Sequence, residues 1–231
     1  MSDLNIVLGH KDFTFPTSPT VDYICYTQRD LKCNLPTVKY DGLDDRIYGE
    51  FGLWYHLVDK NIVSCEDFVA LSHYRRKFEN YYHHTSVAKP FMFPGSVLQQ
   101  CLYYHSVKYN DWFKAILTPQ EYNLLANTHW FYPYNIFGVK GDLLRQWVDF
   151  VGKKLDKLKE ITGLKTFEDC CEFVKNDTTF VAPQPNKNTD VVYQSRIYAT
   201  VTERLNTLFW LLYPGEMYHC EVKLLEEGQR I

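Results

Sequence analysis

Short apolar runs alternate with amphipathic stretches along the chain, and this pattern predicts alternating strands and helices. Four runs rich in β-branched and aromatic residues are predicted strands: residues 5–8, 21–26, 68–72 and 136–140. Five stretches have helical spacing or helix-capping signals: residues 44–60, 118–127, 141–161, 166–175 and 192–212. The alternation predicts one α/β domain with a mainly parallel central sheet flanked by helices.

Local signals mark where several elements begin and end. Thr118 and Glu121 form a capping box with proline in the first turn, and Gly163 follows the long helix at a C-cap position. Residues 77–94 and 176–190 are rich in proline, asparagine and consecutive polar residues, which predicts two irregular loops. Such loops are candidates for a lid over an acceptor.

The predicted strand 68–72 ends abruptly in His73, Arg75 and Arg76. In open α/β folds ligands bind at the carboxyl ends of the strands. Two adjacent arginines there suit a doubly charged, oxygen-rich group such as a pyrophosphate. The alternative is a strand that runs into a solvated basic turn.

Composition narrows the class of protein. The chain has 231 residues, 45% of them hydrophobic, and a net charge of −3, so disorder is excluded and no global charge favours nucleic acid or membranes. Its seven cysteines lack C-x-x-C spacing, which predicts reduced thiols and a cytoplasmic location (host cytoplasm for a phage protein). We expect no signal peptide and no transmembrane segment, because the apolar runs are short.

Five sequence blocks lie in order along the chain. They are G-H-K at 9–11, Y-G-E-F-G-L-W-Y at 48–55, A-L-S-H-Y-R-R-K-F at 70–78, Y-N-I-F at 134–137, and Y-Q-S-R with E-R-L at 193–196 and 203–205. Together they resemble the bacterial capsule and exopolysaccharide glycosyltransferase-like family whose signature is a strand ending in H-Y-R-R. The sequence departs from that family at Gly49 and Gly52, where a cysteine and a threonine are usual.

The resemblance implies a single GT-A-type (Rossmann-type) domain over residues 1–231, with a nucleotide-binding part of about 1–78 and an acceptor-side, helical part of about 79–231. It implies a hexosyl- or pentosyltransferase that uses a nucleotide-sugar donor, with UDP-sugars as the first expectation. The acceptor is expected to be a glycan, as in polysaccharide biosynthesis, or another hydroxyl acceptor. Oligomeric state is left open.

Nine residues are the expected donor and diphosphate site: His10, Lys11, Glu50, His73, Arg75, Arg76, Asn135, Tyr193 and Arg196. Three more are candidates for catalysis: Asp190 and Glu203 as the carboxylate base of an inverting enzyme, and Gln194 as the polar group of a retaining one. A structural ion pair of Glu203 with Arg196 or Arg204 is the competing interpretation. The chain has no D-x-D motif, so we expect arginines to bind the diphosphate without a metal; a metal held with help from His73 is the alternative.

Two other functions compete with glycosyl transfer. One is a module that binds nucleotide sugars or glycans without catalysis. The other is a nucleic-acid-binding protein, with the lysines of residues 153–159 on the DNA backbone. For a glycosyltransferase, a hydroxymethylated base in phage-type DNA modification is an alternative acceptor to a glycan. Aromatic residues, among them Trp130 and Tyr132, can stack on sugars or on bases, although most aromatic residues only pack.

Overall fold

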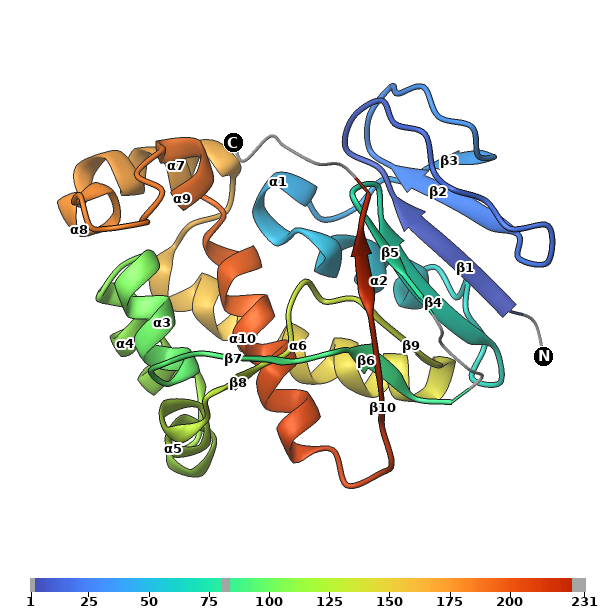
Figure 1. The fold of residues 1–231 in the computed structure, drawn as a ribbon. Helices are drawn as coiled ribbons and strands as arrows, with labels where there is room; N and C mark the ends of the chain where they lie inside the picture. Colours follow the sequence, from blue (N-terminus) through green and yellow to red (C-terminus); the bar gives the residue numbers. More distant parts are fainter. Residues whose placement is uncertain (1–2, 80–83, 226–231) are drawn as a thin grey trace.

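The computed structural model describes residues 3–79 and 84–225, which form an α/β unit around a central sheet (Figure 1). The strands in these residues are β1 (Asp3–Leu8), β2 (Tyr23–Thr27), β3 (Thr37–Lys39), β4 (Phe68–His73), β5 (Arg76–Phe78), β6 (Ser86–Ala88), β7 (Phe91–Met92), β8 (Trp130–Phe131), β9 (Phe137–Lys140), β10 (Tyr218–Cys220) and β11 (Val222–Leu224). The central sheet has the order β10-β6-β9-β4-β1-β2-β3, with β5 pairing β4 and β11 pairing β5. Strands β7 and β8 form a separate small sheet.

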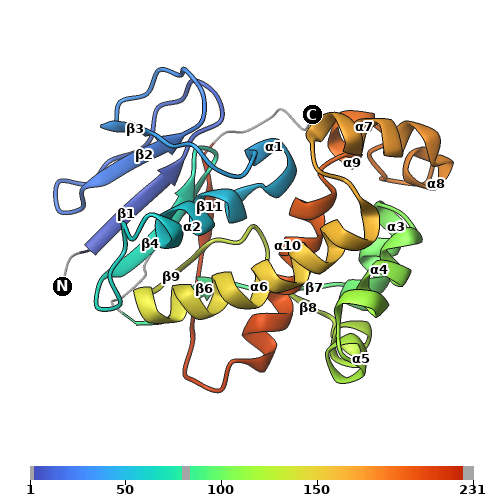
Figure 2. The same ribbon diagram turned by 180° about the vertical axis from the view of Figure 1, so that it is seen from behind.

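The helices fall into two groups. They are α1 (Asp45–Tyr48), α2 (Glu50–Asp59), α3 (Val97–Tyr104), α4 (Lys108–Ile116), α5 (Pro119–Asn127), α6 (Gly141–Thr162), α7 (Phe167–Asn176), α8 (Thr178–Val181), α9 (Val191–Gln194) and α10 (Ile197–Leu212). Helices α2, α6 and α10 lie close to the sheet, whereas α3–α5 and α7–α9 gather on the side away from β1–β3 (Figures 1 and 2).

The prediction of a mainly parallel sheet is confirmed. Strand β1 pairs in parallel with both β2 and β4, and β6 pairs in parallel with β10. Strand β9 runs antiparallel to β4 and to β6, and β5 antiparallel to β4, so β5 and β9 oppose the other strands of the described sheet. As a result β1, β2, β4, β6 and β10 all end at one edge, which we call the carboxyl edge.

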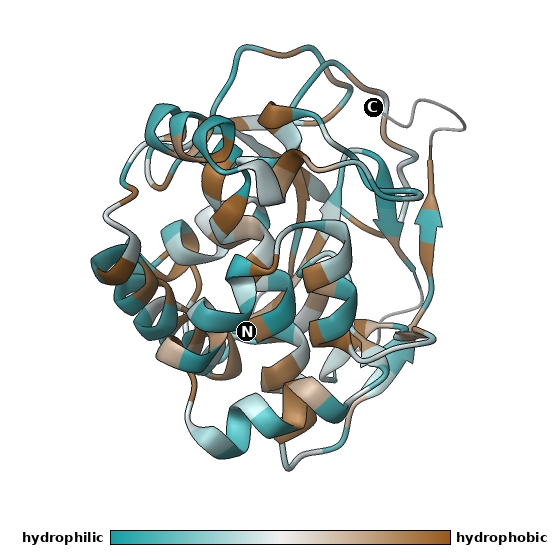
Figure 3. Ribbon diagram, turned by 90° about the vertical axis from the view of Figure 1, so that its left-hand side faces the viewer, coloured by the Kyte–Doolittle hydropathy of each residue, from teal (hydrophilic) through white to brown (hydrophobic). Residues whose placement is uncertain are grey.

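A dense aromatic core joins the sheet to its helices. Trp54 of α2 stacks on Phe137 of β9 with ring centroids 4.6 Å apart. Asn206 of α10 accepts hydrogen bonds from the indole nitrogens of Trp147 and Trp210 at 3.0 and 2.8 Å. The indole nitrogens of Trp147 and Trp210 therefore both have a partner, and these large rings bury apolar area without leaving that polar atom unpaired. Hydrophobic and hydrophilic residues alternate along the helices (Figure 3).

Predicted capping signals are confirmed at several helix ends. Thr118 and Glu121 form both bonds of a capping box at the start of α5. Thr166 does the same with Asp169 at the start of α7, and Gly163 ends α6 with a φ of 69°. These termini were predictable because each depends on local side chains and not on tertiary contacts.

Several predicted elements are wrong or incomplete. The expected loop 77–94 contains β5, β6 and β7 in its described residues, and residues 80–83 lie outside them. The two helices expected as continuous are each broken, one at Gly49 and one at residues 195–196. The chain also forms α3, α4, β10 and β11, which were not predicted, although α3 begins with a capping box of Ser96 and Gln99. Three-residue strands are paired by tertiary contact, so local pattern identifies them poorly.

Candidate functional site

The polar turn after β1 and the signature turn after β4 meet at the carboxyl edge. Register pairs Leu8 with His73, so the residues that follow, His10 and Tyr74, are neighbours. The rings of His10 and His73 lie 5.2 Å apart, and those of His10 and Tyr74 lie 5.8 Å apart. Two sequence blocks that are more than 60 positions apart therefore form one surface.

A buried carboxylate fixes the orientation of His10. Asp45, at the first position of α1, accepts a hydrogen bond from His10 Nδ1 at 2.7 Å and one from Arg29 Nη2 at 2.8 Å. Burial would raise the pKa of Asp45, but the hydrogen bonds and charges of His10 and Arg29 outweigh burial and lower it. Because an ionised Asp45 can only accept a hydrogen bond, Nδ1 of His10 carries the proton in this contact. Nε2 is the ring nitrogen that does not bond to Asp45.

His73 is a buried, neutral residue beneath this surface. Only 3% of its area is exposed, and its Nδ1 accepts a hydrogen bond from the backbone nitrogen of Arg75 at 3.3 Å. Burial lowers its pKa well below the usual value, and the nearby charges of His10, Arg76, Arg75 and Arg196 lower it further. This bond holds the β4–β5 turn and assigns the remaining proton of His73 to Nε2.

Four cationic side chains lie around this buried histidine, and we call Lys11, Arg75, Arg76 and Arg196 the cationic cluster. Lys11 and Arg75 both lie against the ring of Tyr74, at 5.6 and 5.2 Å from its centroid. Arg76 stacks on the ring of Tyr134 at 3.9 Å. Arg75 and Arg76 directly follow the end of β4 at the carboxyl edge, and Arg196 is near enough for its charge, like theirs, to lower the pKa of His73.

Tyr134 and Asn135 bring an unusual backbone to the same edge. Both have positive φ, 69° and 50°, a conformation that is costly for residues other than glycine. Asn135 is fully buried; its backbone carbonyl accepts from Trp54, and its side-chain amide has no hydrogen-bond partner among the described residues. In this conformation the ring of Tyr134 lies against the guanidinium of Arg76.

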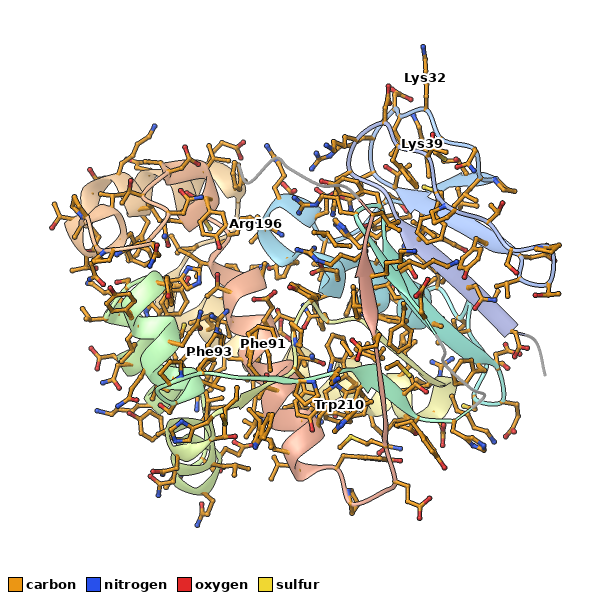
Figure 4. All side chains as sticks on the ribbon, in the orientation of Figure 1. Lys32, Lys39, Phe91, Phe93, Arg196 and Trp210 are labelled. Carbon is orange, nitrogen blue, oxygen red and sulfur yellow. The ribbon has the colours of Figure 1, made fainter. Side chains whose placement is uncertain are left out.

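Gly49 lets α1 approach the start of α10. Its φ is 57°, and a Cβ built there would lie 3.2 Å from the Cβ of Ala199 and 3.5 Å from Nη2 of Arg196. The departure from the resembled family at this position therefore has a local reason, close packing at a left-handed residue. It brings Glu50 (8% exposed), the first residue of α2, next to the first turn of α10. Figure 4 shows Arg196 where α10 begins, facing α1.

Glu203, on α10, is a carboxylate whose pKa is affected by the charges of this cluster. Burial raises its pKa above the usual range and Glu50 adds to this, while Arg204, Arg196 and Arg76 oppose it. Its side chain is 29% exposed, so part of it faces solvent, and its Oε2 accepts from Arg204 Nη1 at 3.1 Å. The ion pair with Arg204 that competed with a catalytic role is therefore present, and burial still raises the pKa of the Glu203 carboxyl.

The other candidates lie on α9 and serve its structure. Asp190 caps α9, with its Oδ1 accepting from the backbone of Tyr193 at 2.8 Å. Gln194 is buried, and its amide bonds Tyr104, Asn188 and His105. The ring of Tyr193 stacks on His105 at 6.0 Å, and burial lowers the pKa of His105 to about 3. None of these bonds leads to the cationic cluster, and their catalytic roles stay predictions.

Asp45 and Arg29 are site residues that the sequence interpretation missed. Asp45 lies near the start of the predicted helix 44–60 and was not among the expected site residues, and Arg29 lies in a loop with no motif. A signal existed, since Arg29 follows strand β2, which is parallel to β1 and ends at the same edge. Which side chains contact a histidine that follows another strand depends on the tertiary structure, and residue spacing does not reveal it.

Two expectations about other ligands can be compared with the geometry. Among residues 3–79 and 84–225 no three His, Cys, Asp or Glu side chains are arranged to hold a metal ion, and no helix is long and apolar enough to cross a membrane. Lys153 pairs with Asp149 at 2.6 Å and Lys154 with Glu121 at 2.9 Å. These two lysines of the basic run therefore already have carboxylate partners.

Comparisons with known proteins bear on the fold. No family model matches the chain, and no curated protein matches its sequence. Among solved structures, the WbbM bifunctional glycosyltransferase in its apo form is similar over 98% of this chain, with a TM-score of 0.60 and 12% sequence identity. The chain spans 46% of that protein. The mixed α/β architecture described above is therefore also the architecture of part of a solved glycosyltransferase.

Proposed function

We propose that this chain is a glycosyltransferase that moves a sugar from a nucleoside-diphosphate donor to a hydroxyl group of an acceptor glycan. The observation that carries the proposal is the convergence of the cationic cluster and Glu203 at the carboxyl edge. Ligands of open α/β sheets bind at this edge. The fold shared with part of a solved glycosyltransferase supports the same reading.

In this proposal the cationic cluster binds the diphosphate. Arg75 and Arg76 offer planar, paired N–H donors to phosphate oxygens, and Arg196 adds a third guanidinium from the start of α10. When the bond between C1 of the sugar and the diphosphate oxygen breaks, its electron pair goes to that oxygen. The cations stabilise the charge that develops there, which is the main task of a transferase site.

Glu203 is the proposed general base. As the acceptor oxygen bonds to C1, its proton must leave, and a carboxylate with a raised pKa accepts it more readily than an ordinary one. His10, fixed by Asp45, is proposed to contact the diphosphate or the base through Nε2. We propose UDP-sugars as the first donors to test, with the arginines replacing a metal.

The test is a panel of UDP-, GDP-, dTDP- and CMP-sugars, added to the protein with and without EDTA. The readouts are the thermal unfolding midpoint and the release of free nucleotide. Stabilisation by one diphosphate sugar, together with slow donor hydrolysis that survives EDTA, supports the proposal and its arginine-based mechanism. A signal abolished by EDTA points to a metal, and no response to any donor overturns the transferase assignment.

A further inference from the structure

A cavity of about 330 Å³ opens on the surface, and none of its lining residues belongs to the candidate site described above. It is lined by Lys89, Pro90, Trp130, Tyr132, Leu211 and His219. Its volume is near the lower end of the range for small-molecule sites. Three separate segments build it: the residues after β6, the β8 region, and the chain from the end of α10 through β10.

Part of the cavity wall, Lys89 and Pro90, lies at the carboxyl edge that carries the cationic cluster. Lys89 and Pro90 directly follow β6, and β6 is separated from β4 by β9 alone. Neighbouring strands are about 4.8 Å apart, so β4 and β6 are separated by about 10 Å. Along α10, Leu211 follows Glu203 by eight residues, a rise of about 12 Å. Both estimates place the cavity about 10–12 Å from the candidate site. A short oligosaccharide spans this separation, and a single sugar does not.

The wall of the cavity combines one exposed ring with paired polar groups. Trp130 is 50% exposed, whereas the other tryptophans of the chain are at most 7% exposed. Tyr132 Oη and His219 Nε2 lie 3.3 Å apart, and Lys89 Nζ pairs with Glu221 Oε1 at 2.8 Å. Because this lysine already has a carboxylate partner, the wall suits an uncharged ligand better than a phosphate.

The polar groups of the wall suit hydroxyl groups. Burial, with a contribution from the charge of Lys89, lowers the pKa of His219, so the ring is neutral near pH 7 and both donates and accepts hydrogen bonds. An exposed indole face beside neutral donors and acceptors matches a sugar ring, which has an apolar face of C–H groups and an equator of hydroxyls. Around the cavity, exposed Phe91 and Met92 extend the apolar surface toward β7. Figure 4 labels Phe91, Phe93 and Trp210 in this part of the molecule, below Arg196.

We propose that this cavity binds an uncharged sugar unit of the acceptor, with Trp130 stacking on the ring and Tyr132 and His219 bonding its hydroxyls. Its assignment to the acceptor rests on the glycosyltransferase function proposed above, whereas sugar binding itself does not. The reacting end of the glycan would then lie at Glu203, and a unit further along the glycan would lie on Trp130. The cavity would select acceptors by length as well as by composition.

Trp130 provides a direct reporter, because it is the exposed tryptophan of the chain. The probes are neutral tetrasaccharides of glucose, galactose, mannose and rhamnose, the matching monosaccharides, an acidic tetrasaccharide, and UDP. We expect at least one neutral tetrasaccharide to shift the tryptophan emission and to protect it from acrylamide quenching. We expect its affinity, measured by calorimetry, to fall about tenfold or more in Trp130→Ala, since one ring contact is lost.

Matched variants separate the cavity from general effects. Trp130→Phe keeps an aromatic ring and should retain much of the affinity, and Tyr55→Ala removes a ring that is 38% exposed on α2 and should change nothing. The thermal midpoint of each variant verifies that it is folded. Unchanged tetrasaccharide affinity in Trp130→Ala overturns the proposal, as does a wild-type protein that binds no neutral tetrasaccharide or binds only the acidic one.

UDP distinguishes this proposal from the proposed function. Binding of UDP that is unaffected by Trp130→Ala, together with loss of tetrasaccharide binding, supports both. A protein that binds tetrasaccharides through Trp130 but no nucleotide or nucleotide sugar keeps the sugar site and loses the transferase assignment. A protein that binds a nucleotide or nucleotide sugar but no tetrasaccharide keeps the transferase assignment and overturns the proposed sugar site in the cavity.

Discussion

Asp45 accepts a 2.7 Å hydrogen bond from Nδ1 of His10, and it does so from a helix that begins 35 residues further along the chain. The carboxylate is buried and also accepts from Arg29, so it joins the ends of β1 and β2 to the start of α1. The block that follows β1 is thereby fixed at the carboxyl edge before any ligand arrives.

Replacing Asp45 by asparagine should weaken this junction. The asparagine side chain has one oxygen in place of the two carboxylate oxygens that accept from His10 and Arg29, and we expect the free energy of unfolding to fall by about 1–3 kcal/mol. Urea unfolding at neutral pH measures the change. Asp44→Asn is the control, since the side chains of its ion pair with Arg46 are 31% and 46% exposed and asparagine also caps a helix, so it should change stability by less than about 1 kcal/mol. Equal effects of the two variants would contradict the role given to Asp45.

Gly49→Ala should destabilise the protein strongly, although it adds only one methyl group. The new Cβ would lie 3.2 Å from that of Ala199, at a φ of 57°, and we expect a cost of about 1–3 kcal/mol in unfolding free energy. Gly152→Ala is the matched control in the middle of α6, where the new Cβ meets only Phe51 at 3.8 Å. That variant should gain up to about 1 kcal/mol from helix propensity. Destabilisation by both, or by neither, would refute the packing argument.

Two buried neutral histidines should make the fold sensitive to mild acid. The folded-state pKa of His73 is well below its usual value and that of His105 is about 3, so the unfolded chain binds protons that the folded chain does not. Stability should therefore fall as pH drops below about 6.5, by about 1.4 kcal/mol per pH unit for each histidine. His105→Phe should reduce this slope by about one proton in urea unfolding measured at several pH values. A slope that stays the same would show that His105 does not titrate on unfolding.

Glu203→Gln should separate catalysis from donor binding. The loss of a general base should lower the rate constant of transfer about 10²- to 10⁴-fold, while nucleotide affinity stays within a few-fold. In the wild type the rate should rise with pH through a value above that of an ordinary glutamate, because burial raises the pKa of Glu203, and the variant should lack this rise. Asp190→Asn keeps a helix cap and should transfer sugar normally. If Asp190→Asn loses sugar transfer and Glu203→Gln keeps it, the general base is Asp190 and not Glu203.

The sequence predicted best what local chemistry determines. The capping box at Thr118, the end of α6 at Gly163 and the buried strand that leads to His73 were all identified, because each depends on neighbouring residues. The breaks at Gly49 and Arg196 were missed, since both helices are interrupted by packing of α1 on α10. The short strands β10 and β11 were missed for a related reason, because their pairing partners lie far along the chain.

The residues of the candidate site also fall into two groups, those that the sequence predicted and those that only the fold brings together. Arg75 and Arg76 were found because they end an apolar strand, and Arg196 and Glu203 through the resemblance to a family. Asp45 was passed over, because only the fold brings it to His10. The amide of Gln194 looked available in the sequence, yet in the fold it bonds three neighbours.

We propose that arginines at the carboxyl edge bind a diphosphate without a metal. Calorimetric titration of UDP, GDP and dTDP into wild type and Arg76→Ala, all in EDTA, tests it most directly. Lys153→Ala, which removes an exposed charge on α6, is the control. One nucleotide should bind wild type and the control equally and Arg76→Ala about 10- to 100-fold more weakly, since charge-assisted hydrogen bonds are lost. Equal binding by Arg76→Ala, or no binding by wild type until a divalent metal is added, would contradict the account.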